Sequence, residues 1–225
     1  CIRLVFCGGT SLSKAHGLIE RMSEDADLKV GLTDAGKALS RTKLKRYLGD
    51  EVRGRVARAL ADVGLVEDAE RAIALNEYRY MHSQWSYGHR YPASTGLRPN
   101  LQLEFTVRAP VLPTAEIPLC ALADRLAGTK GASFDVLTIS VAETLAEKVL
   151  SFLRWFAQHR SGRVLLSWDT ALVRHIYDAH CIVTHDPDIV DVCAPAFNEL
   201  LAGDVGCTRP NASNIKACSA WHAFC

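Results

Sequence analysis

The chain has 225 residues, of which 48% are hydrophobic and 23% charged, and its formal net charge is +1. This balance is typical of a globular protein and excludes a strongly basic nucleic-acid binder. No apolar run reaches the length of a membrane span, and no segment resembles a secretory signal. We therefore expect a cytoplasmic protein without a membrane contact. Because the chain opens at Cys1 inside an apolar strand, we also expect a fragment that lacks an upstream helix.

The first elements in chain order indicate an α/β unit. Residues 2–7 (IRLVFC) predict a strand, and Gly8-Gly9 predicts a turn. A helix is expected over residues 10–22 and a second strand over 26–32. Strand, turn, helix and strand in this order are typical of an α/β fold.

The next segment, residues 35–63, predicts one or two helices and is the most basic part of the chain. Two interpretations are open. The cations form the solvated face of a helix, or they form a track for a phosphate backbone. The cations of this segment are Lys37, Arg41, Lys43, Lys45, Arg46, Arg53, Arg55 and Arg58.

The middle of the chain has the character of strands. Residues 76–91 are aromatic and predict extended structure, and residues 101–107 (LQLEFTV) alternate between apolar and polar positions. Three prolines within residues 109–118 predict a loop or the edge of a sheet.

The character changes near residue 135. Helices are expected over residues 140–160, over 168–183 with Asp169 as a cap, and over 195–204. We therefore predict an α/β core over residues 1–135 and a helical domain over 136–225, with a disordered tail after about residue 205.

The acidic residues suggest a metal site. Asp25 and Asp27 follow Glu24, and in a strand both aspartates leave the same face. Two such carboxylates repel each other unless a cation neutralises them, and Mg²⁺ binds carboxylate oxygens together with substrate phosphates. Glu104, the only acid of the alternating strand over residues 101–107, lies on its polar face and would complete the site as a third ligand.

The glycine turn suggests a matching phosphate site. Gly8 and Gly9 open a helix whose free N–H groups attract anions, and the absence of Cβ lets a triphosphate approach the backbone. Thr10 adds a hydroxyl donor. Lys14 is either a further phosphate ligand or a solvated lysine of the first helix.

The order of these motifs resembles the polymerase-beta-like nucleotidyltransferase superfamily. In detail it is similar to the AbiEii-type nucleotidyltransferase toxins of type IV toxin–antitoxin and phage-defence (abortive infection) systems. The blocks that carry the resemblance are GGTSLSKAHGLIERMSEDADL (8–28), LQLEF (101–105), ETLAEKVLSFLR (143–154) and RHIYDAH (174–180).

The resemblance implies a mixed-sheet α/β (α+β) core followed by a C-terminal helical region. It implies that Gly8, Gly9 and Thr10 bind the nucleotide, and that Asp25, Asp27 and Glu104 ligate Mg²⁺. It also assigns catalytic roles to a lysine and an aspartate of the helical region, which correspond to Lys148 and Asp178.

The residues themselves leave both roles in the helical region open. Lys148 lies within an apolar stripe of its helix, so it faces a phosphate, snorkels to solvent or pairs with an acid. Asp178 follows Arg174 by four positions, which is also the spacing of a helical ion pair.

The resemblance implies an Mg²⁺-dependent transfer of a nucleoside monophosphate from an NTP to an acceptor, a reaction of EC 2.7.7 type. The expected acceptor is RNA, notably the tRNA 3′ end, and the expected partner is an antitoxin, a winged-helix regulator encoded upstream. Two alternatives remain open: nucleotidylation of a protein hydroxyl, and a degenerate relative that binds nucleotide or a partner without turnover.

Cysteine and histidine offer a weaker alternative. The cysteines at 193, 207, 218 and 225 are either a zinc knuckle or unpaired thiols in a reducing cytoplasm. His175, His180 and His185 recur every five residues, a spacing that spreads them around a helix instead of gathering them at a metal.

Overall fold

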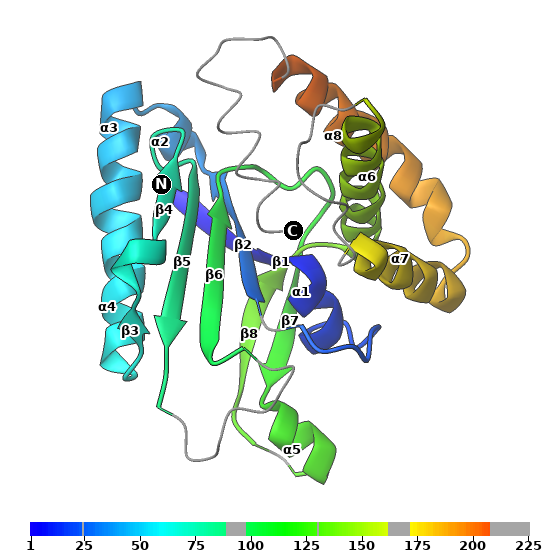
Figure 1. Cartoon of the computed structure of the whole chain (residues 1–225), viewed down its shortest axis with the longest axis horizontal. Helices are drawn as coiled ribbons and strands as arrows, with labels where there is room; N and C mark the ends of the chain where they lie inside the picture. Colours follow the sequence, from blue (N-terminus) through cyan, green and yellow to red (C-terminus); the bar gives the residue numbers. More distant parts are fainter. Residues whose placement is uncertain (24, 89–97, 130, 162–171, 208–225) are drawn as a thin grey trace. The chain divides into compact units, whose positions relative to one another are not determined.

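The computed structural model describes residues 1–23, 25–88, 98–129, 131–161 and 172–207 (Figure 1). The chain divides into two compact units. The first unit comprises Cys1–Ala15, Arg21–Pro110 and Glu116–Thr138, and the second comprises His16–Glu20, Val111–Ala115 and the chain from Ile139 onward. The division into an α/β core and a helical domain near residue 135 stays a prediction.

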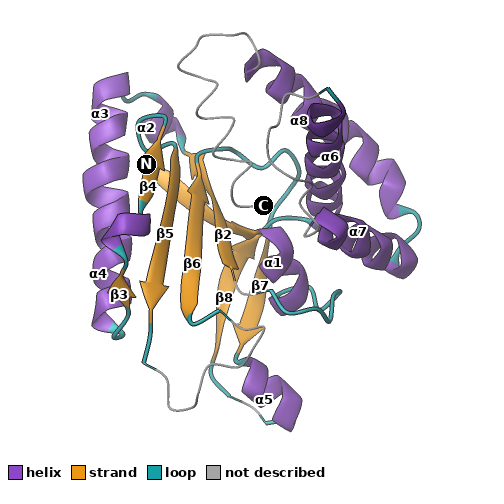
Figure 2. Ribbon diagram, viewed as in Figure 1, coloured by secondary structure: helices purple, strands orange, loops and turns teal. Residues whose placement is uncertain are grey.

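The first unit is built on one mixed sheet, drawn in orange in Figure 2. The strand order is β3-β5-β6-β2-β1-β8-β7, and β4 pairs with β5. The β2–β6 and β1–β8 pairs are parallel, whereas β1–β2, β3–β5, β4–β5 and β5–β6 are antiparallel. The predicted mixed-sheet α/β class is therefore confirmed. The strands are β1 (Ile2–Cys7), β2 (Asp25–Leu32), β3 (Val66–Glu67), β4 (Ile73–Leu75), β5 (Tyr80–Ser86), β6 (Asn100–Thr106), β7 (Ala115–Cys120) and β8 (Ser133–Thr138).

The helices of the first unit are short, apart from one continuous stretch over residues 41–62. In this stretch α3 leads through a π-helical segment, η1, into α4 without a break. A ring of Tyr78 packs so closely on the stretch that a Cβ at Gly49 would lie 2.9 Å from it. The elements are α1 (Gly8–Lys14), α2 (Asp34–Lys37), α3 (Arg41–Arg46), η1 (Tyr47–Arg53), α4 (Gly54–Asp62), η2 (Ala69–Arg71) and α5 (Leu122–Ala127).

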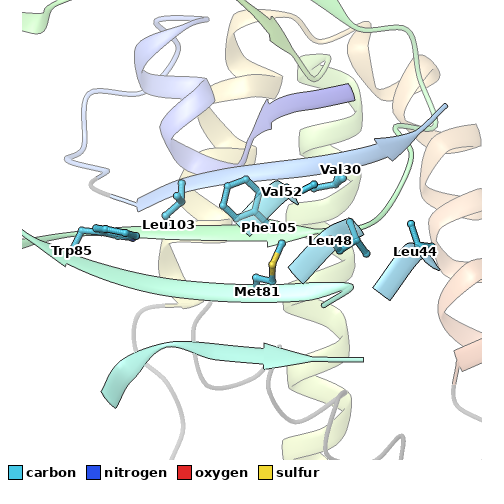
Figure 3. Close-up of a cluster of buried hydrophobic side chains, with 8 residues drawn as sticks. All are labelled: Val30, Leu44, Leu48, Val52, Met81, Trp85, Leu103 and Phe105. Carbon is cyan, nitrogen blue, oxygen red and sulfur yellow. The ribbon is translucent and has the colours of Figure 1, made fainter. Parts of the chain in front are cut away.

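The core of the first unit lies between this helical stretch and one face of the sheet (Figure 3). Successive residues of a strand point to opposite faces, so the even positions of β2 and the odd positions of β5 and β6 share this apolar face. The buried members of the cluster are Val30, Leu44, Leu48, Val52, Met81, Trp85, Leu103 and Phe105.

The opposite face of the same strands is polar, because the alternation of the pleat places the intervening residues there. The helical stretch over residues 41–62 therefore covers one face and leaves the polar side chains on the other. The polar-face residues are Asp25, Asp27 and Lys29 on β2, Tyr80, His82 and Gln84 on β5, and Gln102, Glu104 and Thr106 on β6.

The second unit contains three long helices: α6 (Val141–Arg160), α7 (Val173–His185) and α8 (Ile189–Cys207). The side chain of Ser140 caps α6 by accepting the N–H of Glu143 at 3.2 Å. Both α7 and α8 pack against α6. No helix in the described ranges is both long and apolar enough to cross a lipid bilayer.

Two of the expected helices differ from the structure, and two elements of the structure were not expected. The helix expected over residues 10–22 ends at Lys14, and Gly17 then takes a left-handed φ of 66°, so the chain leaves the first unit there. The strand β8 and the helix α5 were not predicted, because neither segment shows a strong periodic pattern. The last helix is longer than residues 195–204, since it begins at Ile189 and contains Pro195. The expected cap at Asp169 and most of the expected disordered tail lie outside the described residues.

Candidate active site

Asp27 and Glu104 form the centre of the polar face. They are register partners on the parallel strands β2 and β6, so their side chains leave the same face side by side. Burial raises the pKa of Glu104 to about 8, and the negative charge of Asp27 adds to the shift. The hydroxyl of Tyr80 donates to Glu104 Oε2 at 3.1 Å and opposes it. A cation placed beside the two carboxylates would stabilise both in the ionised form.

Asp25 lies two residues before Asp27 on the same face, where the guanidinium of Arg98 holds it. Arg98 Nη1 lies 2.5 Å from Asp25 Oδ1 and 2.6 Å from Gln102 Oε1. Arg98 was not among the site residues predicted from the sequence. Its only signal there is a cation two residues before the strand that carries Glu104.

These residues have the donor atoms that a divalent cation prefers, but their side chains are not yet arranged around one point. Among the described residues, no three His, Cys, Asp or Glu side chains are grouped closely enough to hold a metal ion. Arg98 is paired with Asp25, while Asp27 and Glu104 are neighbours that would repel each other if both were ionised. Carboxylate oxygens are the donors that Mg²⁺ prefers. The donor set therefore fits such a cation, and Asp25 would have to leave Arg98 to join it.

The turn predicted at Gly8 and Gly9 lies beside these carboxylates. Gly8 has a φ of 75°, and a Cβ at this position would collide with Asp27 Oδ2. A Cβ at Gly9 would lie 2.6 Å from Nη2 of Arg21, so the absence of a side chain makes room for this guanidinium. Arg21 is a second cation that the analysis of the sequence missed, and it lies close to the predicted phosphate site.

Thr10 and Lys14, the other residues predicted to bind nucleotide, lie on the seven-residue helix α1. The hydroxyl of Thr10 donates to the backbone oxygen of Asp25 and lies 2.8 Å from the hydroxyl of Ser23. It thereby ties α1 to the start of β2, which carries the two aspartates. Lys14 lies in the last turn of α1, where a cation also stabilises the helix dipole.

Two further residues of the polar face, His82 and Lys29, could not be recognised from the sequence, because their place beside the acids depends on how the strands pair. His82 lies opposite Glu104 on β5 and is only 4% exposed. Burial lowers the pKa of His82, although a backbone hydrogen bond with Arg71 and the charge of Asp25 oppose this effect. Lys29, two residues after Asp27, is equally buried. The environment of the carboxylates thus contains a histidine and a lysine as well as acids.

Lys148 and Asp178 meet in the second unit. The Nζ of Lys148 on α6 lies 3.3 Å from Oδ2 of Asp178 on α7, and Asp178 is fully buried. Lys148 was expected to face a phosphate, to snorkel to solvent or to pair with an acid, and in the structure it pairs with an acid. A catalytic role for either residue stays a prediction.

The basic helical stretch over residues 41–62 covers the apolar face of the sheet. Arg41, Arg53 and Arg55 form ion pairs with Glu77, Glu67 and Glu51. The carboxylates Asp27 and Glu104 leave the opposite face. A phosphate backbone bound along this stretch would therefore have to pass around an edge of the sheet to reach them.

The alternative of a zinc knuckle concerns residues that lie partly outside the described ranges. Cys218 and Cys225 lie outside the described residues, and Cys193 is buried in α8. The three histidines His175, His180 and His185 all lie on α7. In the described part of the chain, neither set belongs to a group of ligands close enough for a metal.

Comparison with known proteins identifies the class to which this chain belongs, that of the nucleotidyl transferases. Residues 1–216 match the family described as "Nucleotidyl transferase AbiEii toxin, Type IV TA system". The chain belongs to this family of toxins of type IV toxin–antitoxin systems. No curated protein gives a significant match.

One solved structure to which the chain is similar is MenT4, a nucleotidyltransferase toxin from Mycobacterium tuberculosis H37Rv. The match has 24% sequence identity and a TM-score of 0.43. It covers 67% of this chain but only 44% of the MenT4 chain, so the chain spans less than half the length of this relative.

Proposed function

We propose that this protein transfers a nucleoside monophosphate from an NTP to an acceptor and releases pyrophosphate. The observation that carries the proposal is the pairing of Asp27 with Glu104 beside the Gly8 turn, in a chain of the AbiEii family. Asp27 and Glu104 are adjacent acids, and the pKa of Glu104 is strongly raised. A cation bound between them would stabilise the ionised form of both.

In this proposal Asp27, Glu104 and Asp25 hold Mg²⁺, which when bound would stabilise negative charge on the phosphates and on the leaving pyrophosphate. The Gly8-Gly9 turn receives the triphosphate, and the nearby guanidinium of Arg21 supplies a charged donor to its oxygens. Thr10 keeps the turn and the acidic strand together. Catalysis by such a site consists mainly of positioning and charge stabilisation.

Lys148 is the residue of the second unit to which we assign a phosphate-binding role, and Asp178 is the residue that orients it. The support is the ion pair, in which a fully buried carboxylate fixes the direction of a lysine that is itself only 14% exposed. A lysine held in this way presents its charge without the loss of side-chain entropy that ordering it on binding would require.

We propose RNA, in particular the tRNA 3′ end, as the acceptor, and inhibition of growth in the cytoplasm as the biological result. An antitoxin encoded upstream, of the winged-helix type, would restrain the activity, and phage defence would be its setting. These assignments rest on the family to which the chain belongs.

The acceptor is tested by incubating the protein with Mg²⁺, each labelled NTP, and separate pools of RNA and protein. We expect label in RNA from one preferred NTP. Label that enters only protein would replace the RNA assignment with nucleotidylation of a protein hydroxyl. No label in either pool would favour a degenerate relative that binds without turnover.

The proposed carboxylates are tested with Asp27→Asn, and with Asp34→Asn as the matched control. Asp34 is a fully exposed aspartate of α2, paired only loosely with Lys37 at 3.8 Å. We expect Asp27→Asn to abolish both nucleotide transfer and growth arrest, and Asp34→Asn to leave both intact. Equal growth arrest by the wild-type protein and Asp27→Asn would refute a catalytic role for the acidic site.

A further inference from the structure

The carboxylate of Asp25 already has a cation, and the chain itself supplies it. A single nitrogen of Arg98, Nη1, lies 2.5 Å from Asp25 Oδ1 and 2.6 Å from Gln102 Oε1. Asp25 and Gln102 are register partners on the neighbouring strands β2 and β6. The guanidinium therefore bridges the two strands that carry the acidic residues, at one end of the row formed by Asp25 and Asp27.

We propose that Arg98 competes with the divalent cation for Asp25 and so determines how tightly the protein binds that cation. This inference rests on the proposed function, because it takes Asp25 to be a ligand of the cation. It assigns to Arg98 a positioning role: the arginine keeps Asp25 in place and neutralised until the cation arrives.

Direct competition follows from the short distance. A Mg²⁺ ion lies about 2.0–2.1 Å from a ligating oxygen. A guanidinium at hydrogen-bond distance from the same carboxylate would face the ion as a like charge at close range, so each cation weakens the binding of the other at Asp25. The carboxylate therefore binds one at the expense of the other.

The exchange is feasible because the pair is only partly buried. The side chains of Arg98 and Asp25 are 41% and 34% exposed, so water can solvate the guanidinium when the pair opens. This contrasts with Lys148 and Asp178 in the second unit, where the carboxylate is fully buried. The Arg98 pair is a contact that can open at modest cost.

The released guanidinium gains a second use. Its planar donors match phosphate oxygens in geometry, so after the exchange Arg98 can bind the triphosphate of the nucleotide. Cation and nucleotide would then favour each other's binding, because each removes one partner from the Asp25–Arg98 pair.

The test measures the affinity of the full chain for Mn²⁺ alone, by isothermal titration calorimetry. We expect Arg98→Gln to bind Mn²⁺ about two- to fivefold more tightly than the wild-type protein, the range that corresponds to loss of a partly exposed ion pair. Arg41→Gln is the matched control, because it removes the ion pair between Arg41 and Glu77. Arg41 lies on α3, away from the acidic face. This control should leave the affinity unchanged.

A second variant separates direct competition from a general effect of charge. Gln102→Ala removes the other acceptor of Arg98 Nη1 without changing any charge, and we expect it to raise the affinity for Mn²⁺ in the same direction, though less. If Arg98→Gln tightens binding while Gln102→Ala does not, the effect is one of the overall field, and direct competition is refuted.

The outcomes also separate this inference from the proposed function. If the wild-type protein transfers nucleotide and binds Mn²⁺ at least as tightly as Arg98→Gln does, the role of Arg98 is refuted and the proposed function stands. Absence of Mn²⁺ binding in both proteins would overturn the cation site and the role of Arg98 together.

Discussion

At the scale of single residues, Gly8 is the position where the backbone and the acidic site constrain each other most directly. Its φ of 75° is one that L side chains rarely adopt, and the space where a Cβ would lie is filled by the Asp27 carboxylate. Both properties require glycine, and only the first can be anticipated from a Gly-Gly turn.

We expect Gly8→Ala to lower the free energy of unfolding by roughly 2–5 kcal/mol, from backbone strain together with the steric clash. The matched control is Gly64→Ala: Gly64 has a φ of 85° but no atom within 4 Å of an added Cβ, so only the strain of about 1–2 kcal/mol applies. Urea unfolding of the two variants measures the difference. Equal losses would show that Asp27 moves aside without cost.

Glu104 gives the molecule a pH dependence whose sign follows from its raised pKa of about 8. The folded protein holds this proton at pH values where the unfolded chain, with an ordinary glutamate, has released it. The stabilising effect of the bound proton is complete below about pH 4.5 and is lost as the pH rises through about 8.

Urea unfolding from pH 5 to pH 9 without divalent cations should therefore show a decline in wild-type stability that Glu104→Gln lacks. Mg²⁺ should reduce the decline, because a cation favours the ionised carboxylate, and its binding should strengthen as the pH rises toward 8. A difference between the two proteins that stays constant across this range would contradict the raised pKa.

At the scale of elements, the first turn of α6 anchors a neighbouring segment of the second unit. The carboxylate of Glu143 is fully buried and accepts the backbone N–H groups of Val111 and Leu112 at 3.0 and 2.9 Å. A buried acceptor that satisfies two backbone donors joins two stretches of chain that are distant in sequence.

We expect Glu143→Ala to lower the free energy of unfolding by roughly 2–4 kcal/mol, because two partly buried N–H groups lose their acceptor. Glu199→Ala on α8 is the control, since Glu199 is exposed and its loss should change stability by no more than about 0.5 kcal/mol. Hydrogen exchange should show faster exchange of the Val111 and Leu112 amides in Glu143→Ala alone. Unchanged protection of both amides would count against the anchoring role.

The regular elements were the part of the fold most accessible from the sequence. The strand Ile2–Cys7 and the helix Val141–Arg160 follow from clear patterns, an apolar run before a glycine turn and a capped amphipathic period. The strand Ser133–Thr138 was missed, because its identity depends on pairing with β1, a partner more than a hundred residues away. The end of α1 at Lys14 was also missed, although Gly17, three residues further on, is a local signal of a helix end.

At the scale of the whole molecule, the predicted catalytic residues are divided between the two units. Asp25, Asp27 and Glu104 belong to the first, and Lys148 and Asp178 to the second. Cation binding should therefore be separable from the function of the second unit.

We expect Lys148→Met to abolish nucleotide transfer while leaving the affinity for Mn²⁺ unchanged, whereas Asp27→Asn should lose both. Removal of Lys148 also leaves a buried carboxylate without its cation, which should lower the free energy of unfolding by roughly 3–5 kcal/mol. Asp178→Asn together with Lys148→Met should recover part of this stability but no transfer. Weakened Mn²⁺ binding by Lys148→Met would mean that the two sets of residues form a single site.

The sequence by itself determined the mixed α/β class, the strands that carry the acids and the family, because these depend on local patterns and on motifs with fixed spacing. Only the tertiary structure decided which side chains of different strands lie beside one another. The parallel register of β2 and β6 places Asp27 beside Glu104. Arg98 forms an ion pair with Asp25. The basic helices pack on the apolar face of the sheet, opposite to these acids. Strand pairing and the pleat set these neighbours, and both arise from contacts between segments far apart in the chain.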